Sequence, residues 1–173
     1  MLFGIEKGTE ILLEGFLCLF LLFSRDSVAG KEAVFMIEIA VYHHDSQQRK
    51  KVLQDFINSL KQSRVYGKVY SIQNLQKFSE NLLNGKYQFD IICIDTAEKE
   101  YAQMLMEHTP SNPEYILLDT PAEEVSGYMR YKPAAWIHSD SGGQREVSKA
   151  LQSCLYHLHR KREECFCIRT KAK

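Results

Sequence analysis

The sequence predicts an α/β protein in which a parallel five-stranded sheet lies between two layers of helices. Short apolar, β-branched runs alternate five times with segments whose apolar residues recur at helical spacing, all between residues 36 and 162. Parallel strands need crossover connections, which the helices supply, and such crossovers are right-handed. This count and alternation favour a doubly wound, flavodoxin-like sheet with strand order 2-1-3-4-5.

The individual elements follow from the same patterns. Among the expected strands, the run at 89–94 is the most continuous apolar one, as expected of a central parallel strand. Asp45 or Ser46 is suited to cap the first helix, and Asn84 with Gly85 ends the second. Strands are expected at 37–42, 65–72, 89–94, 115–118 and 134–138. Helices are expected at 46–64, 74–83, 97–108, 123–131 and 144–162.

Composition narrows the class of protein. The 173 residues carry 22 Lys+Arg and 22 Asp+Glu, so the net charge is zero, and 45% of the residues are hydrophobic. These values argue against disorder and against a chain that coats nucleic acid along its whole length. Five cysteines form no even framework of disulfides, and a chain of this length buries a core without them. A reducing, cytoplasmic location is therefore expected.

Residues 1–35 differ from the rest of the chain. The apolar run at 11–23 is interrupted by Glu14 and Gly15 and falls short of the roughly 20 residues that a membrane-spanning helix needs. The residues before it carry no net positive charge, unlike a secretory signal. Two further alternatives stay open: a true signal or anchor, and a translation start at Met36 that makes 1–35 foreign to the protein. The domain is expected at 36–162, and no membrane partner is expected.

Polar residues follow the ends of four expected strands. In an open parallel sheet the functional crevice lies outside the carboxyl ends of the strands, at the switch point between strands 1 and 3. The candidate site residues at these ends are His43, His44, Asp45, Asp95, Asp119, Thr120 and Ser139.

Two of these segments carry a resemblance. The sequence FDIICID at 89–95 resembles the third strand of response-regulator receiver domains, and IEIAV at 37–41 resembles their first strand. The tail CFCIRTK at 165–171 is similar to the opening strand of the LytTR DNA-binding domain, so 163–173 is expected to be a linker and the start of that domain. The resemblance implies a two-component, LytTR-type transcription regulator with Asp95 as the phosphoacceptor. It also implies a histidine kinase or another regulatory protein as partner, and DNA binding only through the domain that is missing here.

Departures from the receiver pattern affect the Mg²⁺ site first. Receivers hold Mg²⁺ with two acidic residues after strand 1 and the acceptor aspartate, because this hard cation prefers oxygen ligands. His43 and His44 occupy the two acidic places. Asp45 follows one position later and supplies a ligand beside Asp95 only if the loop shifts. No other cofactor is expected.

The positions that contact the phosphoryl group in receivers also differ from the family pattern. Asp119 stands where the family has a hydroxyl residue, and Thr120 is displaced by one position. Ser139 replaces the lysine after strand 5. The sequence therefore predicts a degenerate receiver that is not an enzyme and that acts through protein–protein interaction with weak or no phosphorylation. An ordinary role for Asp95, capping the next helix, is the alternative.

The receiver output face gives a second set of candidates. Tyr128, Tyr131 and Trp136 fall in the expected fourth helix and fifth strand and are candidate anchors for a homodimer. Core packing is the alternative, and it is favoured more for Trp136 than for the tyrosines.

A rival interpretation is a stand-alone flavodoxin-like domain that senses a small molecule or a metal ion at the His43/His44/Asp95 rim. Imidazole and carboxylate ligands suit Zn²⁺ or Ni²⁺. Adjacent residues seldom point into one site, so no metal ligands are predicted. The loop after strand 1 lacks the Gly, Ser and Thr content expected of a flavin phosphate cradle, and no nucleophile elbow, Walker loop or dinucleotide glycine motif occurs.

Overall fold

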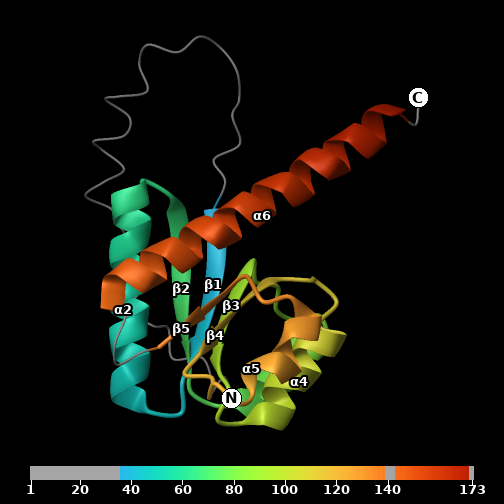
Figure 1. Ribbon diagram of the computed structural model, residues 1–173. Helices are drawn as coiled ribbons and strands as arrows, with labels where there is room; N and C mark the ends of the chain where they lie inside the picture. Colours follow the sequence, from blue (N-terminus) through green and yellow to red (C-terminus); the bar gives the residue numbers. More distant parts are fainter. Residues whose placement is uncertain (1–35, 139–142, 172–173) are drawn as a thin grey trace.

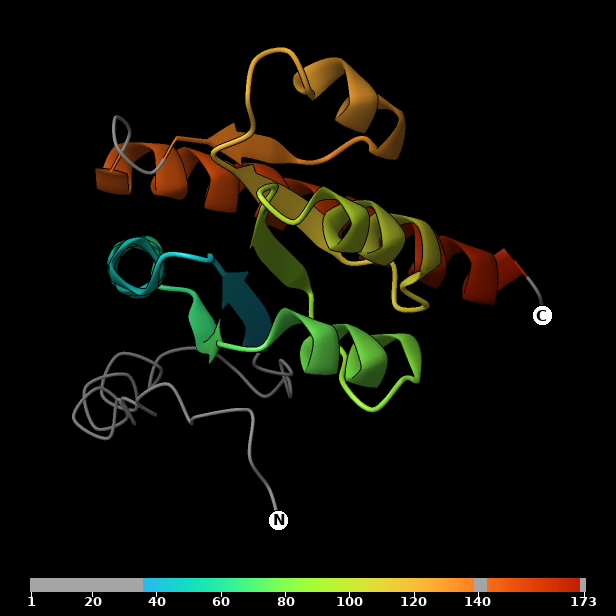
Figure 2. The same cartoon turned by 90° about the horizontal axis from the view of Figure 1, so that it is seen from below.

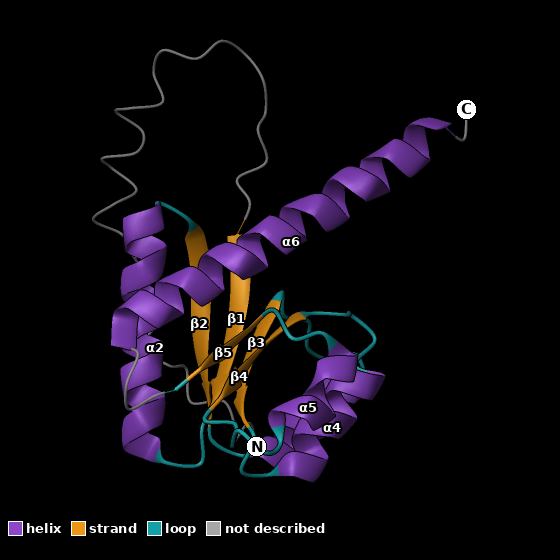
Figure 3. Ribbon diagram, in the orientation of Figure 1, coloured by secondary structure: helices purple, strands orange, loops and turns teal. Residues whose placement is uncertain are grey.

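The five expected strands form one parallel sheet, in the expected order β2-β1-β3-β4-β5. The structure is a computed structural model, and it describes residues 36–138 and 143–171, with side chains up to residue 161. Figure 3 shows the strands as a twisted sheet between helices. The strands are β1 (Met36–Tyr42), β2 (Tyr66–Ile72), β3 (Ile91–Asp95), β4 (Glu114–Leu118) and β5 (Ala135–Ile137).

Helices cover both faces of the sheet. In Figure 2, α2 and α6 lie on one side, and α3, α4 and α5 lie on the other. The fold class is thus the predicted doubly wound α/β sandwich. The helices are α2 (Ser46–Ser63), α3 (Leu75–Leu83), α4 (Lys99–His108), α5 (Val125–Tyr128) and α6 (Gly143–Lys171), with a 3₁₀ turn, η2 (Met129–Tyr131), directly after α5.

Alternation along the strands divides the core into two layers. Ile39, Ile91 and Ile116 face the layer beneath α2 and α6, whereas the next residues along each strand face the layer beneath α3, α4 and α5. Side chains of a strand point alternately to the two faces, so an apolar run without polar interruptions is what a sheet covered on both faces requires. Every residue of β3 and β4 is buried.

Helix ends agree with local sequence signals. Asp45 caps α2 by accepting the backbone N–H groups of Gln47 and Gln48, and Asn74 caps α3 in the same way through the N–H of Lys77. Carboxylate and amide oxygens satisfy donors that have no partner within the helix.

Two helices differ from their predicted lengths. The helix expected at 123–131 is only four residues of α-helix followed by η2, and Lys132 ends it in the left-handed region at φ 52°. The helix expected at 144–162 instead runs through Lys171, because no proline or glycine interrupts it after Gly143. The expectation of strand at 165–171 is therefore wrong: this segment is helical.

The long helix α6 crosses one face of the sheet and extends beyond it at its C-terminal end (Figure 1). Glu114, at the start of β4, fixes this crossing through two side chains of α6. Its carboxylate lies 3.0 Å from Nδ1 of His157 and 2.6 Å from Nζ of Lys161. Because Glu114 is only 7% exposed, these two contacts replace the water that its carboxylate loses on burial.

Gly67 in β2 marks a close approach between the sheet and α2. A Cβ at this position would lie 3.0 Å from Cδ1 of Leu60 and 3.1 Å from the backbone oxygen of Ile37. We expect Gly67→Ala to lower the free energy of unfolding by about 1–3 kcal/mol, the usual cost of overpacking. Urea denaturation measures this, with Gly127→Ala as the control, because a Cβ there meets nothing within 4 Å. Equal stability of the two variants would contradict the close approach.

Within 36–138 and 143–171, no helix combines the length and the apolar character needed to span a membrane. The apolar run at 11–23 lies outside the described residues.

Candidate functional site at the carboxyl end of the sheet

Asp95 is the last residue of β3 and lies at the centre of the carboxyl edge of the sheet. Its side chain is 1% exposed. Tyr42 of β1 pairs with Ile94 and Leu118 of β4 pairs with Asp95, so the loops after β1 and β4 both begin beside this carboxylate. Strand register alone therefore brings the predicted rim residues together.

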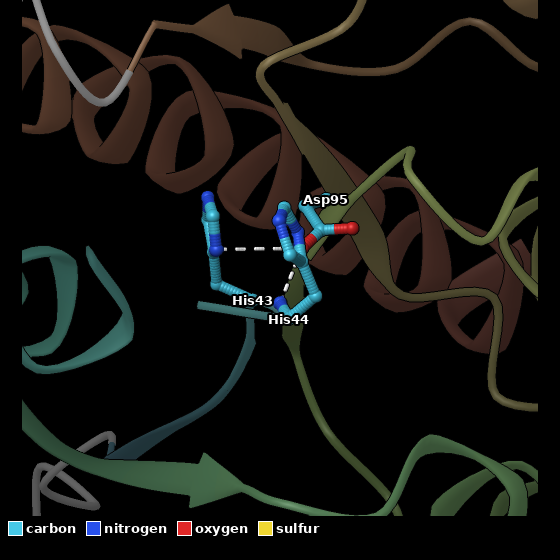
Figure 4. A group of neighbouring side chains, drawn as sticks. All are labelled: His43, His44 and Asp95. Atoms are coloured by element: carbon cyan, nitrogen blue, oxygen red, sulfur yellow. Dashed lines mark hydrogen bonds and ion pairs between the residues drawn. The ribbon is translucent and has the colours of Figure 1, made fainter. Parts of the chain in front are cut away.

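Both carboxylate oxygens of Asp95 are engaged by the protein itself. Oδ2 accepts the backbone N–H of His44 at 2.5 Å and lies 2.8 Å from Nδ1 of the same residue (Figure 4). Oδ1 accepts the backbone N–H of Ala97 at 3.0 Å. The carboxylate thus ties the loop after β1 to the turn after β3.

His43 lies between two carboxylates. Its Nε2 is 2.8 Å from Oδ2 of Asp119, and its Nδ1 accepts the backbone N–H of Asp45 at 3.0 Å. Because an N–H already points at Nδ1, that nitrogen carries the lone pair, and neutral His43 has its proton on Nε2 for Asp119. Nδ1 is also 3.4 Å from Oδ2 of Asp95.

The two histidine rings stack, contrary to the prediction that adjacent side chains diverge. Their centroids are 4.7 Å apart with 24° between the ring planes. The reason is that β1 ends at Tyr42, so His43 and His44 no longer follow strand alternation. Figure 4 shows both rings beside Asp95. The side chain of His43 is buried, whereas that of His44 is 57% exposed.

Asp45 does not join this group. Its carboxylate accepts the backbone N–H groups of Gln47 at 2.6 Å and Gln48 at 3.1 Å, and these bonds hold the pKa of Asp45 below its ordinary value. The residue is exposed and serves as the helix cap. Asp45 and Asp95 are therefore not placed as a pair of Mg²⁺ ligands.

The loop after β4 places Asp119 toward His43. Asp119 has a left-handed backbone, with φ 49°, and its N–H donates to the carbonyl of Ile137 at 2.9 Å. A short polar residue such as Asp tolerates this conformation better than most. Thr120 is 3% exposed, and its hydroxyl has no hydrogen-bond partner among the described residues. The same holds for the hydroxyl of Thr96, which is also 3% exposed. Ser139 lies outside the described residues.

The three aromatic candidates do not form a common surface. Tyr128 is completely buried, which corrects its prediction as an exposed anchor: α5 is one turn long and lays this ring into the core layer. Trp136 is partly buried against the same layer. Tyr131 is also partly buried, and its hydroxyl donates to Glu107 at 2.7 Å, beside the guanidinium of Arg130.

Two contacts around the rim were not predicted from the sequence. The hydroxyl of Tyr42 donates to Glu98 at 2.5 Å, and burial, followed by this hydrogen bond, raises the pKa of Tyr42. Arg49 donates from its guanidinium to the carbonyl of His43 at 2.8 Å. The six-residue spacing from His43 to Arg49 puts Arg49 on the first turn of α2, which is the only signal that points to this contact.

The buried cysteines have no reactive character. Cys93 and Cys154 carry free, buried thiols. Burial raises the pKa of Cys93 and raises that of Cys154 to about 12, so neither is a thiolate near neutral pH.

Comparisons with known proteins show that other proteins share this fold, and they show nothing beyond the fold. No family model matches the chain, and no curated protein matches it. One similar solved structure is a yeast Spc42 trimeric coiled-coil segment fused to another protein, with TM-score 0.58 and 13% identity, covering 81% of this chain and 90% of that one. Another is a protein described as pilus assembly-related from Burkholderia pseudomallei, with TM-score 0.51 and 16% identity, covering 74% of this chain and 94% of that one. At these identities the fold is the shared property.

Proposed function

We propose that this chain is a receiver-like regulatory module that acts by binding other proteins and not by turnover of a phosphoryl group. The observation that carries the proposal is the engagement of Asp95. This residue ends β3, where the resemblance to receivers implies a phosphoacceptor, yet both oxygens accept N–H groups of the chain and the side chain is 1% exposed. The oxygen that attacks phosphorus must be reached by the phosphoryl donor, and at 1% exposure the Asp95 carboxylate is closed to a donor of that size.

The charge of the site supports the same proposal. Phosphoryl transfer needs a divalent cation to neutralise developing charge, and Mg²⁺ requires oxygen ligands. His43 and His44 offer ring nitrogens instead, and the carboxylate of Asp45 caps α2. Asp119 adds a further negative charge next to His43, where a phosphorylated Asp95 would experience repulsion.

The partners we propose are proteins of a two-component, LytTR-type regulatory system in the cytoplasm. They comprise a histidine kinase or another regulatory protein and a second copy of the chain. DNA would be contacted only through a further domain. Of the three aromatic candidates, Tyr131 and Trp136 remain for such an interface, since both are partly exposed and Tyr128 is buried.

The test is intact-mass spectrometry of the full chain after incubation with acetyl phosphate and Mg²⁺. We expect no phosphorylated species for the natural sequence. The double variant His43→Asp/His44→Asp restores two acidic groups beside Asp95 and removes the Nδ1 contact at 2.8 Å, so it is expected to gain one phosphoryl group.

The matched control adds Asp95→Ala to that double variant and should lose the gain. Phosphorylation of the natural chain that disappears in Asp95→Ala would overturn the proposal, since it would show Asp95 working as an acceptor. A double variant that folds, as judged by circular dichroism, and still gains nothing would argue against a receiver ancestry for this site.

A further inference from the structure

We infer that His43, His44 and Asp95 form a binding site for a divalent transition-metal ion, with Zn²⁺ as the best match. One ligand atom from each residue lies within 4.8 Å of the other two. The inference does not depend on the receiver role, because it rests on these side chains alone.

The separations of the two ring nitrogens from the Asp95 oxygen are close to those of a tetrahedral zinc site. Zinc–nitrogen and zinc–oxygen bonds of about 2.0–2.2 Å place neighbouring donor atoms roughly 3.3 Å apart. Nδ1 of His43 is 3.4 Å from Oδ2 of Asp95, so this pair already has the required spacing. Nδ1 of His44 is 2.8 Å from the same oxygen and must move outward slightly, which its exposed position allows.

The surroundings of His43 are those of a metal ligand. Histidine ligands commonly donate their second ring N–H to a carboxylate, which fixes the tautomer and makes the free nitrogen more basic. Nε2 of His43 makes this contact with Asp119 at 2.8 Å, and its Nδ1 lies 3.4 Å from Oδ2 of Asp95, the contact drawn in Figure 4. Binding replaces the Asp45 N–H contact at Nδ1 of His43 with a coordination bond, and the proton on Nδ1 of His44 moves to Nε2 of the same ring so that Nδ1 can bind the ion.

The donor set decides the class of cation. Two imidazoles and one carboxylate suit Zn²⁺ and related borderline ions, whereas Mg²⁺ and Ca²⁺ require oxygen ligands. Three protein ligands leave a fourth position for water or for a group on a partner, and the exposed ring of His44 places that position at the surface.

The experiment is calorimetric titration of the full chain with Zn²⁺. Cysteine is a common zinc ligand, so Cys165 and Cys167 are replaced by serine in every sample. We expect one Zn²⁺ per chain and at least about 100-fold weaker binding for His44→Ala, since losing a ligand costs at least as much as losing a supporting contact. Asp119→Asn should weaken binding by about tenfold.

The matched control is His108→Ala, which removes a histidine that is 66% exposed and paired with Glu107 outside the site. It should bind Zn²⁺ as tightly as the background chain, which carries only the two replacements Cys165→Ser and Cys167→Ser. Co²⁺ should give visible ligand-field bands without a thiolate charge-transfer band, and His44→Ala should abolish them.

Failure of the background chain to bind Zn²⁺, or equal binding by His44→Ala, would overturn the inference. The phosphorylation test contains no zinc, so its outcome and this one are independent. Because His44 is exposed, loss of binding in His44→Ala with unchanged thermal unfolding reports a lost ligand and not a lost fold.

Discussion

Replacing Tyr128 with alanine is expected to lower the free energy of unfolding by about 3–5 kcal/mol, the range for removing a large aromatic side chain from a core. Tyr128 is fully buried and packs in the layer beneath α3, α4 and α5. The short helix α5 has little hydrogen bonding of its own to keep it in place, so this ring is its main attachment to the sheet. Urea denaturation monitored by circular dichroism measures the change.

The matched control is Tyr128→Phe, which keeps the ring and removes a buried hydroxyl that has no partner among the described residues. It should leave stability unchanged or raise it by about 1–2 kcal/mol. Burial raises the pKa of Tyr128 from 10.0 to about 12, so its neutral form is favoured in the folded state. The stability that depends on the neutral hydroxyl is fully present below pH 10 and is lost as the pH rises toward 12. Tyr128→Phe has no ionisable hydroxyl, so its free energy of unfolding should not show this pH dependence.

The two variants also separate core packing from dimer contact. If Tyr128 anchored an interface, alanine would change the association state at constant stability. We expect alanine to lower the free energy of unfolding in denaturation experiments and to leave the association state unchanged in sedimentation experiments. An alanine variant as stable as the natural chain would contradict the buried position.

The sheet was predictable because its signal is repeated along the chain. Residues such as Ile92 and Leu117 belong to apolar runs that only a strand covered on both faces explains. Helix-period segments between the runs force parallel pairing, and parallel pairing limits the possible strand orders. The confirmed order 2-1-3-4-5 therefore follows from patterning without knowledge of any individual contact.

The site was predictable in position but not in geometry. Strand ends identified His43, His44, Asp95 and Asp119, and the structure brings all four together. Ring stacking of the two histidines depends on backbone torsions after Tyr42, which residue types do not specify. The burial of Tyr128 similarly depends on how α5 is tilted, because an aromatic residue in a short polar helix suits either the core or the surface.

Asp95→Ala is expected to lower the free energy of unfolding by about 2–4 kcal/mol, although a phosphoacceptor is ordinarily a functional and not a stabilising residue. The carboxylate, which is 1% exposed, accepts the backbone N–H groups of His44 and Ala97 in two partly buried hydrogen bonds, and its removal leaves both donors without this partner. An unsatisfied buried donor costs about 1–3 kcal/mol. The ring of His44 also loses its partner at 2.8 Å.

Asp45→Ala is the matched control for this prediction. Asp45 likewise accepts two backbone N–H groups, from Gln47 and Gln48, but it does so at the surface, where water replaces the lost contacts. Its loss should cost about 1 kcal/mol, the usual value for a helix cap. A larger effect for Asp95 than for Asp45 would show that burial makes the Asp95 contacts structural. Equal or smaller destabilisation by Asp95→Ala would mean that its oxygens are free for chemistry, and the case against phosphorylation would then lose its main support.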